Sequence, residues 1–250
     1  MRVPAGGETR PIPRPSRPHR DALRCRQGLA ALEFAFLAPV LLLFLAGLHD
    51  LTTAFIAWQR LTATAQATAQ IATLMAATAS SPNTLTVNQA SAAASVIYAY
   101  LPDTVTAATS RFGVTLSSVV MTPTVSTCTT ACTYTAHVAW SGVFAGAATT
   151  ARPCDGKTAA ISVAADSAEP TASTLPADAY SAAPLLVVDV AYTFTPLFTS
   201  VITGSFQMRR AAYFAPRTGE SSDWIRYFYA GSPDATAHCT GYGWATGSAT

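Results

Sequence analysis

The chain has 250 residues and a formal net charge of +2; half of its residues are hydrophobic and only 11% are charged. So few charges, with much Ala, Thr and Ser, are typical of an exported domain and argue against a cytoplasmic enzyme. About 200 residues remain beyond an N-terminal tail and an apolar run, which is enough for one hydrophobic core.

Residues 1–27 form a basic leader rich in proline and arginine. Seven arginines stand against two acidic residues up to Gly28, a net charge of +5, so the rest of the chain carries −3. The leader has no apolar periodicity, and we predict that it is disordered and cytoplasmic. A basic flank beside a first apolar span stays inside and directs the C-terminal domain outward. Because the leader lacks interleaved aromatic residues, we expect no nucleic-acid partner.

Residues 28–50 are predicted to form a transmembrane segment. Its apolar run, Leu29–Leu48, contains a single charged residue, Glu33. A helix rises roughly 1.5 Å per residue, so this run can cross a hydrocarbon core of about 30 Å. Pro39 cannot donate a backbone hydrogen bond, and we expect a helix kink there.

Residues 51–80 are predicted to continue this helix outside the membrane, because they contain neither glycine nor proline. Small apolar side chains recur in steps of three or four, which marks one helix face. The pattern leaves open whether this face packs on the chain's own domain, on other subunits, or on both. The face consists of Leu61, Ala65, Ala69, Ala72, Ala76 and Ala79, and the side predicted to face water carries Thr62, Gln66, Gln70 and Thr73.

The exported domain, residues 51–250, is predicted to have an α+β fold. A second short helix is expected at 87–101, and an antiparallel sheet of about four strands within 111–216. The strand-forming runs are Arg111–Thr122, Thr133–Phe144, Leu185–Leu197 and Ser205–Pro216. In the third run, the face expected to point to the core carries Val188, Val190, Tyr192 and Phe194.

Two parts of this domain lack a clear pattern. A long insertion, 145–184, separates the second and third strands, and it is either a surface loop pinned by a disulfide or a segment with elements of its own. The tail, 221–250, is rich in aromatic residues and contains Cys239. We expect its aromatic side chains to cover the core.

The cysteines agree with export. Cys25 precedes the span, on the side where a thiol stays reduced, and four cysteines follow it. Four cysteines allow two disulfides in three pairings, and the sequence leaves the pairing open. A tetrahedral metal site that uses the same sulfurs, with His238, is the alternative. The four are Cys128, Cys132, Cys154 and Cys239.

Motifs for catalysis are missing from the sequence. It has no Gly-x-Ser-x-Gly elbow, no phosphate-binding loop and no His-Glu-x-x-His, and its four histidines are scattered. We therefore predict no catalytic residue, no cofactor and no metal.

Glu33 is the one charged residue inside the apolar run, and it needs a functional explanation. A carboxylate inside a spanning helix is disfavoured by about 2.5 to 3.5 kcal/mol on insertion scales. Near the start of the run, Glu33 can extend to the interface. If the chain is cut after Gly28, the new amino group of Leu29 lies near the depth of Glu33. In a staggered assembly, the amine of one subunit would then neutralise the carboxylate of the next.

The segment from Gly28 to Pro39, GLAALEFAFLAP, resembles the processing site of type IV pilin-like proteins and the TadE/TadG-like family of the tight-adherence (Flp) pilus system. The similarity continues through Trp58–Ala69 and returns more weakly in Val187–Pro196 (VVDVAYTFTP) and before Arg217. Its specificity lies in the glycine, the glutamate and the proline together with the basic flank.

This resemblance implies a pilin-like fold and a minor, pseudopilin-like role, since the chain is much longer than a major Flp pilin. A prepilin peptidase would act at Gly28 and Leu29, and Glu33 and Phe34 would serve subunit assembly. The protein would be single-pass in the bacterial inner membrane and would help to assemble the fibre used for cell adhesion. The implied partners are other pilin-like subunits, the pilus assembly machinery, the peptidase and the lipid bilayer.

Two other interpretations stay open. In the first, the N-terminal residues are a conventional signal peptide and the protein is a periplasmic or secreted non-catalytic domain. Ala46-Gly47-Leu48 is a poor cleavage site for that purpose. In the second, the protein is an exported enzyme or metal-binding protein that uses the cysteines and His238.

Overall fold

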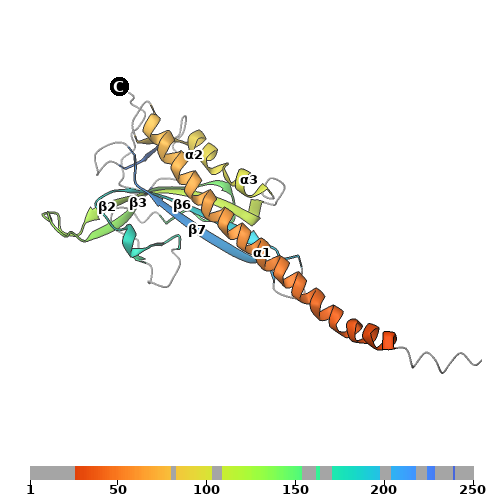
Figure 1. Ribbon diagram of the computed structural model, residues 1–250. Coiled ribbons are helices and arrows are strands. Elements are labelled where there is room, and N and C mark those ends of the chain that lie inside the picture. Colours follow the sequence, from red (N-terminus) through yellow and green to blue (C-terminus); the bar gives the residue numbers. More distant parts are fainter. Residues whose placement is uncertain are drawn as a thin grey trace, which may run out of the picture. The chain divides into compact units, whose positions relative to one another are not determined.

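A computed structural model describes residues 26–79, 83–102, 109–153, 162–163, 171–197, 204–217, 224–228 and 239. Side chains are not described for 26–30, 162–163 and 228. The chain divides into two units, Met1–His49 and Asp50–Thr250. The second unit is α+β, as predicted, and Figure 1 shows its sheet with the helices α1, α2 and α3.

The long helix α1 runs without interruption over Arg26–Thr78, 53 residues. From Asp50 onward, its small residues are buried against the domain of the same chain. Leu61, Ala65, Ala69, Ala72 and Ala76 are each at most 1% exposed and belong to the main hydrophobic cluster. Side chains this short let the helix axis approach the sheet closely. Packing within the chain is therefore confirmed for this face.

One residue of the predicted water-facing side is buried instead. Gln66 and Gln70 are exposed, but Thr73 is only 1% exposed. Its hydroxyl donates to the Gln70 carbonyl at 3.0 Å. That bond satisfies the hydroxyl within the helix, so Thr73 can be buried without a partner from another element.

The region predicted as one helix at 87–101 holds two. α2 spans Val87–Ala94 and α3 spans Ile97–Tyr100. Thr86 caps α2 in a capping box with Gln89, which satisfies two backbone donors. Between the two helices, the Ser95 hydroxyl donates to the Ala92 carbonyl at 2.6 Å, and Ser95 and Val96 keep right-handed helical backbone angles.

The four predicted strands are confirmed. They are β2 (Phe112–Pro123), β3 (Tyr134–Gly146), β6 (Leu185–Phe194) and β7 (Phe206–Phe214). Their order in the sheet is β3-β2-β6-β7, and each neighbouring pair is antiparallel. Register shifts occur in the β2–β3 pair after Val114 and after Ser118.

Both faces of this sheet are covered. The predicted core side of β6, with Val188, Val190, Tyr192 and Phe194, joins α1, α2 and α3 in the main cluster. On the opposite face a second cluster contains Val187, Val119 and Leu175. Because β-strand side chains alternate, the two faces of β6 belong to different clusters.

The long insertion supplies the cover for the second face. It contains the short strands β4 (Ser162–Val163) and β5 (Thr174–Leu175) and the 3-10 helix η3 (Ala177–Ala179). β4 and β5 pair in parallel. The described part of the insertion therefore has short elements of its own.

The described part of the aromatic tail packs on the core, as expected. β8 (Arg226–Phe228) pairs in parallel with β1 (Thr84–Thr86). The Tyr227 ring lies 5.1 Å from the Trp140 ring, and the Trp140 indole N–H donates to the Ile225 carbonyl at 2.6 Å. Aromatic burial and one hydrogen bond thus join the tail to β3.

Candidate functional site

The first candidate site is the N-terminal part of α1. Among the described residues there is one helix long and apolar enough to cross a membrane, and it lies near the N-terminus. Its large apolar side chains are exposed rather than packed, as a membrane anchor requires. They are Leu32, Phe34, Phe36, Leu37, Val40, Leu41, Leu42, Leu43, Phe44, Leu45 and Leu48.

The predicted processing and assembly residues share this helix. The backbone of Gly28 and Leu29 is helical, since α1 begins at Arg26. Glu33 is exposed, and helical spacing puts it on the same face as Leu37 and Val40, four and seven residues later. Toward the C-terminal end of the helix, that face is apolar.

Pro39 lies inside α1, and the helix continues on both sides of it. Its ring nitrogen carries no hydrogen, so the Ala35 carbonyl four residues earlier loses its usual donor. The expected kink stays a prediction.

Asp50, at the end of the apolar run, is a residue whose role the sequence did not reveal. It is 6% exposed, and its Oδ1 accepts a hydrogen bond from the Leu197 backbone N–H at 3.0 Å. The Thr53 hydroxyl donates to the Asp50 carbonyl at 3.0 Å. Asp50 therefore fastens α1 to the segment that follows β6.

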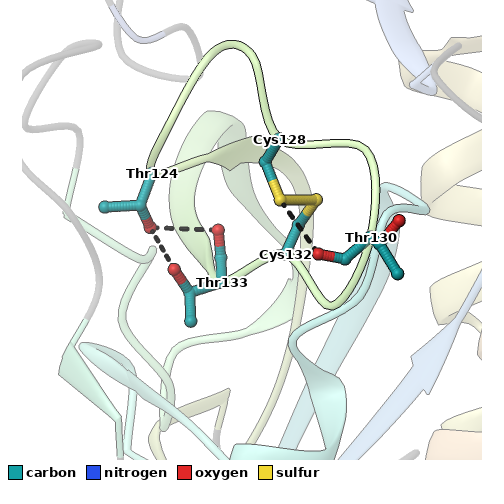
Figure 2. The surroundings of a disulfide bond; sticks show 5 residues. All are labelled: Thr124, Cys128, Thr130, Cys132 and Thr133. Atoms are coloured by element: carbon teal, nitrogen blue, oxygen red, sulfur yellow. Dashed lines mark hydrogen bonds between the residues drawn. A yellow bond between two sulfur atoms is a disulfide. The ribbon is translucent and has the colours of Figure 1, made fainter.

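A second candidate site is the tip of the β2–β3 hairpin, which Figure 2 shows. A disulfide joins Cys128 and Cys132. At the base of the loop the Thr124 hydroxyl donates to the Thr133 carbonyl at 3.0 Å, and the Thr133 hydroxyl donates to the Thr124 hydroxyl oxygen at 3.1 Å. Ala131 has a φ of +52°, a left-handed conformation that the closed loop holds in place.

The other predicted cysteines lie elsewhere. Cys239 is also disulfide-bonded, and its N–H donates to the Ala139 carbonyl on β3 at 3.1 Å. Cys154 and His238 lie outside the described residues. A bonded sulfur is not a thiolate ligand, so Cys128 and Cys132 do not form the tetrahedral metal site considered from the sequence. Within the described ranges no group of three or more His, Cys, Asp or Glu residues could hold a metal ion.

A third candidate is a polar centre on the sheet face covered by the insertion. Arg152, fully buried, binds Asp189 with two hydrogen bonds, from Nε to Oδ2 at 2.8 Å and from a terminal nitrogen to Oδ1 at 2.9 Å. Its other terminal nitrogen donates to the Thr174 carbonyl at 3.0 Å, and its backbone N–H donates to the Ser141 hydroxyl at 2.7 Å. One arginine thus joins β6, β3 and the strand β5 of the insertion.

Burial and charge oppose each other at this centre. Burial raises the pKa of Asp189 above its usual value, and the Arg152 guanidinium beside it acts to lower it. The pKa of Tyr180 is likewise raised by burial, against the lowering effect of Arg152. Arg152 is therefore the main charge that opposes the effect of burial on the pKa of Asp189.

A pocket of about 110 Å³ lies beside this ion pair. Its lining includes Thr149, Thr171, Asp189, Arg209 and Tyr213. Arg152 already engages both oxygens of Asp189. That carboxylate is a structural group here, and its paired geometry does not suit a general base.

The structure does not bring the predicted residues into one site. Gly28, Leu29, Glu33, Phe34 and Pro39 lie on one helix. Of the described cysteines, Cys128 and Cys132 lie at the hairpin tip and Cys239 lies beside β3. Sequence reasoning missed Asp50 and the Arg152–Asp189 pair. A lone charge within an apolar strand, as in LLVVDVAY, is a signal that a buried partner exists, but nothing in the sequence identifies Arg152 as that partner.

Comparison with known proteins bears on the first candidate alone. Residues 28–70 match a family model described as TadE-like protein, and the resemblance is confirmed over these residues. The matched range contains Gly28, Glu33, Pro39 and the first half of the buried alanine face of α1. No curated protein and no solved structure matches the chain.

Proposed function

We propose that this chain, TadE-like over residues 28–70, is a minor, pilin-like, membrane-anchored component of a tight-adherence (Flp) pilus assembly and secretion system. It would act through assembly with other subunits and not through catalysis. One observation carries the proposal: the TadE-like residues coincide with a helix that is apolar and exposed at its N-terminal end and that buries one face, of small residues, in a folded domain beyond Asp50.

The exposed apolar part of α1 suits two environments, the lipid bilayer and a bundle of neighbouring helices. Exposed leucine and phenylalanine side chains are stable in lipid, and the same side chains can pack against neighbouring helices when subunits leave the bilayer. The alanine face cannot serve that purpose, because the chain's own sheet covers it. Assembly contacts of α1 would therefore use its N-terminal half.

Glu33 would supply specificity to that assembly. Processing between Gly28 and Leu29 by a prepilin peptidase would create an amino group near the depth of Glu33, and a neighbouring subunit's amine could then pair with the carboxylate. Phe34 is two-thirds exposed, and it would pack beside this pair. In a low-dielectric environment such a pair is favourable only when both charges are present.

The location follows from the charges. The basic leader would stay in the cytoplasm and the domain from Asp50 onward would face the periplasm or the exterior. The proposed partners are other pilin-like subunits, the pilus assembly machinery, the prepilin peptidase and the bilayer of the bacterial inner membrane.

Two experiments test this proposal. Deleting the gene should reduce the number of surface pili and cell adhesion, and the full-length chain should restore both; normal piliation in the deletion strain would overturn the proposed role.

N-terminal sequencing of the protein from the membrane fraction should give Leu29 as the first residue. An intact Met1 would show a permanent anchor, and a soluble protein that begins near His49 would support the signal-peptide interpretation.

A further inference from the structure

Exposed apolar side chains on α1 continue beyond the predicted end of the membrane span. Leu51, Phe55 and Ile56 are 68%, 59% and 40% exposed. The next charged residue along the helix after Asp50 is Arg60, which is exposed. The apolar surface of this helix therefore ends near Ile56 and not at Leu48.

Asp50 does not interrupt this surface. Its side chain is buried, and its carboxylate accepts the hydrogen bond from the Leu197 N–H. A charge that is turned inward and hydrogen-bonded does not add to the outward surface of the helix. Of the two polar residues at this point of the sequence, Asp50 is therefore removed from that surface, and only His49 remains exposed beside Leu48 and Leu51.

The same end of the sheet presents further apolar side chains. Leu197, whose backbone binds Asp50, is 71% exposed, and Phe206 is 43% exposed. Phe206 pairs with Phe194 across β6 and β7, with ring centres 5.5 Å apart. The end of β6 and the start of β7 therefore lie beside the Asp50 turn of α1.

The length of the apolar surface also exceeds one bilayer core. If Glu33 stays at the inner interface, the residues from Phe34 to Ile56 span about 35 Å as a helix, against about 30 Å for the hydrocarbon core. The excess falls at the domain end of the helix. Leu51, Phe55 and Ile56 would then lie at the outer interface.

Arginines border this apolar end. Arg60 is one turn beyond Ile56. Arg111 donates to the Thr193 carbonyl at 3.4 Å and to the Thr195 hydroxyl at 3.0 Å, so it lies at the same end of the sheet as Leu197. Apolar side chains bordered by arginine are the composition that suits a headgroup interface.

We infer that the domain itself contacts the lipid bilayer through this end, which we call the basal surface: Leu51, Phe55, Ile56, Leu197 and Phe206. The occupant is the outer interface of the membrane that α1 would span, because Leu51, Phe55 and Ile56 follow the anchor residues directly in the sequence of the same helix. This inference rests on the proposed anchoring of residues 31–48.

Photo-crosslinking tests the inference in the full-length protein. A benzophenone amino acid is introduced singly at Leu197, Phe206, Phe44 or Val125, and each variant is reconstituted into vesicles of phosphatidylcholine and phosphatidylglycerol with labelled acyl chains. Phe44 is the positive control in the anchor. Val125 is an exposed apolar residue at the hairpin tip, 59% exposed, and serves as the matched negative control.

Lipid adducts at Leu197 and Phe206 well above the level at Val125, with strong adducts at Phe44, would support the inference. Adducts at Phe44 with Leu197 and Phe206 no higher than Val125 would overturn it while leaving the anchor in place. Crosslinks from Leu197 to a second copy of the chain, in place of lipid, would also overturn it. Absence of adducts at Phe44 would instead contradict the proposed anchor. All four positions are exposed, so folding is expected to survive, and an unchanged circular dichroism spectrum checks this.

Discussion

The Arg152–Asp189 pair shows how single residues hold the insertion on the sheet. The guanidinium uses its side-chain donors on Asp189 and on the Thr174 carbonyl. The Arg152 side chain is fully buried and that of Asp189 is 18% exposed, so the arginine in particular depends on its partner for charge compensation. The pair thus joins the insertion to β6.

Removal of one charge should therefore be costly. We expect Asp189→Ala to lower the free energy of unfolding by about 3 to 5 kcal/mol, because it leaves Arg152 buried without its counter-ion. Asp178→Ala is the matched control, since Asp178 is exposed on η3, and should change it by less than about 0.5 kcal/mol. Urea unfolding of the detergent-solubilised chain measures both, and equal effects would contradict a buried ion pair.

The same pair predicts a pH dependence. In Arg152→Met the lowering effect of the Arg152 guanidinium is lost and only the smaller effect of Arg209 still opposes burial, so the pKa of Asp189 rises further. A carboxyl with a raised pKa in the folded state stabilises the fold below its unfolded pKa and loses that contribution as pH rises through the folded pKa. We expect Arg152→Met to be less destabilised at pH 4.5 than at pH 7.5.

A comparison of urea midpoints at the two pH values, against the wild-type chain, checks this. The double variant Arg152→Met/Asp189→Asn has no carboxyl at this position and should lose the difference. A destabilisation of Arg152→Met that is the same at both pH values would show that Asp189 does not titrate with folding.

Glu33 carries a prediction about assembly. Glu33→Ala removes a disfavoured charge from the span, so membrane insertion should be unchanged or better. The number of surface pili should fall, because the proposed partner amine loses its carboxylate. Glu33→Asp keeps the charge and should retain more pili than Glu33→Ala. Counting pili by electron microscopy measures this, and unchanged pili in Glu33→Ala would remove the assembly argument.

At the scale of elements, the two disulfide regions differ in what they constrain. Cys128 and Cys132 are four residues apart and close only the tip of the β2–β3 hairpin. Cys239 lies at the edge of β3. With Cys128 and Cys132 joined to each other, Cys154 is the remaining cysteine beyond the apolar run, and we predict that it is the partner of Cys239.

These loops should differ in their effect on stability. Loop-closure entropy gives about 2 kcal/mol for the short loop and about 4.5 kcal/mol for a loop of about 85 residues. We therefore expect Cys239→Ser to lower the free energy of unfolding by more than Cys128→Ser does.

Non-reducing peptide mapping should detect a Cys154–Cys239 peptide. A Cys239 peptide linked to any other cysteine would refute the pairing.

The alanine face of α1 carries the second prediction at this scale. Ala69→Leu adds volume where the exposed fraction is zero, and overpacking of this kind costs about 1 to 3 kcal/mol. Gln70→Leu adds a leucine at the adjacent exposed position and should be nearly neutral. Thermal unfolding of the two variants compares them, and a neutral Ala69→Leu would contradict close packing of helix and sheet.

For the whole molecule, charge placement predicts orientation. An epitope inserted after Val125, at the exposed hairpin tip, should bind antibody on intact spheroplasts, and an epitope ahead of Met1 should bind it only after permeabilisation. The seven arginines of the leader supply the retained charge. Replacing four of them with glutamine should increase labelling of the N-terminal epitope. Labelling of that epitope on intact spheroplasts of the native chain would reverse the proposed topology.

Much of the fold follows from local sequence patterns. The four strands were visible because Val, Thr, Tyr and Phe recur with a period of two, and the alanine face of α1 because small residues recur with a helical period. Asp189 and Thr73 are polar residues whose surroundings such patterns do not predict. Periodicity gives the face of a residue, but the partner that satisfies a buried polar group comes from a distant part of the chain.

The sequence by itself determined the apolar helix, its carboxylate at Glu33, its basic flank and its TadE-like character, because each depends on residues that are neighbours in the chain. Only the tertiary structure decided that the insertion forms a second covered face, that Arg152 holds Asp189, and that Asp50 turns inward to Leu197. The physical reason is that these are contacts between residues tens to well over a hundred positions apart. Such contacts form only when hydrophobic burial of both sheet faces brings the segments together.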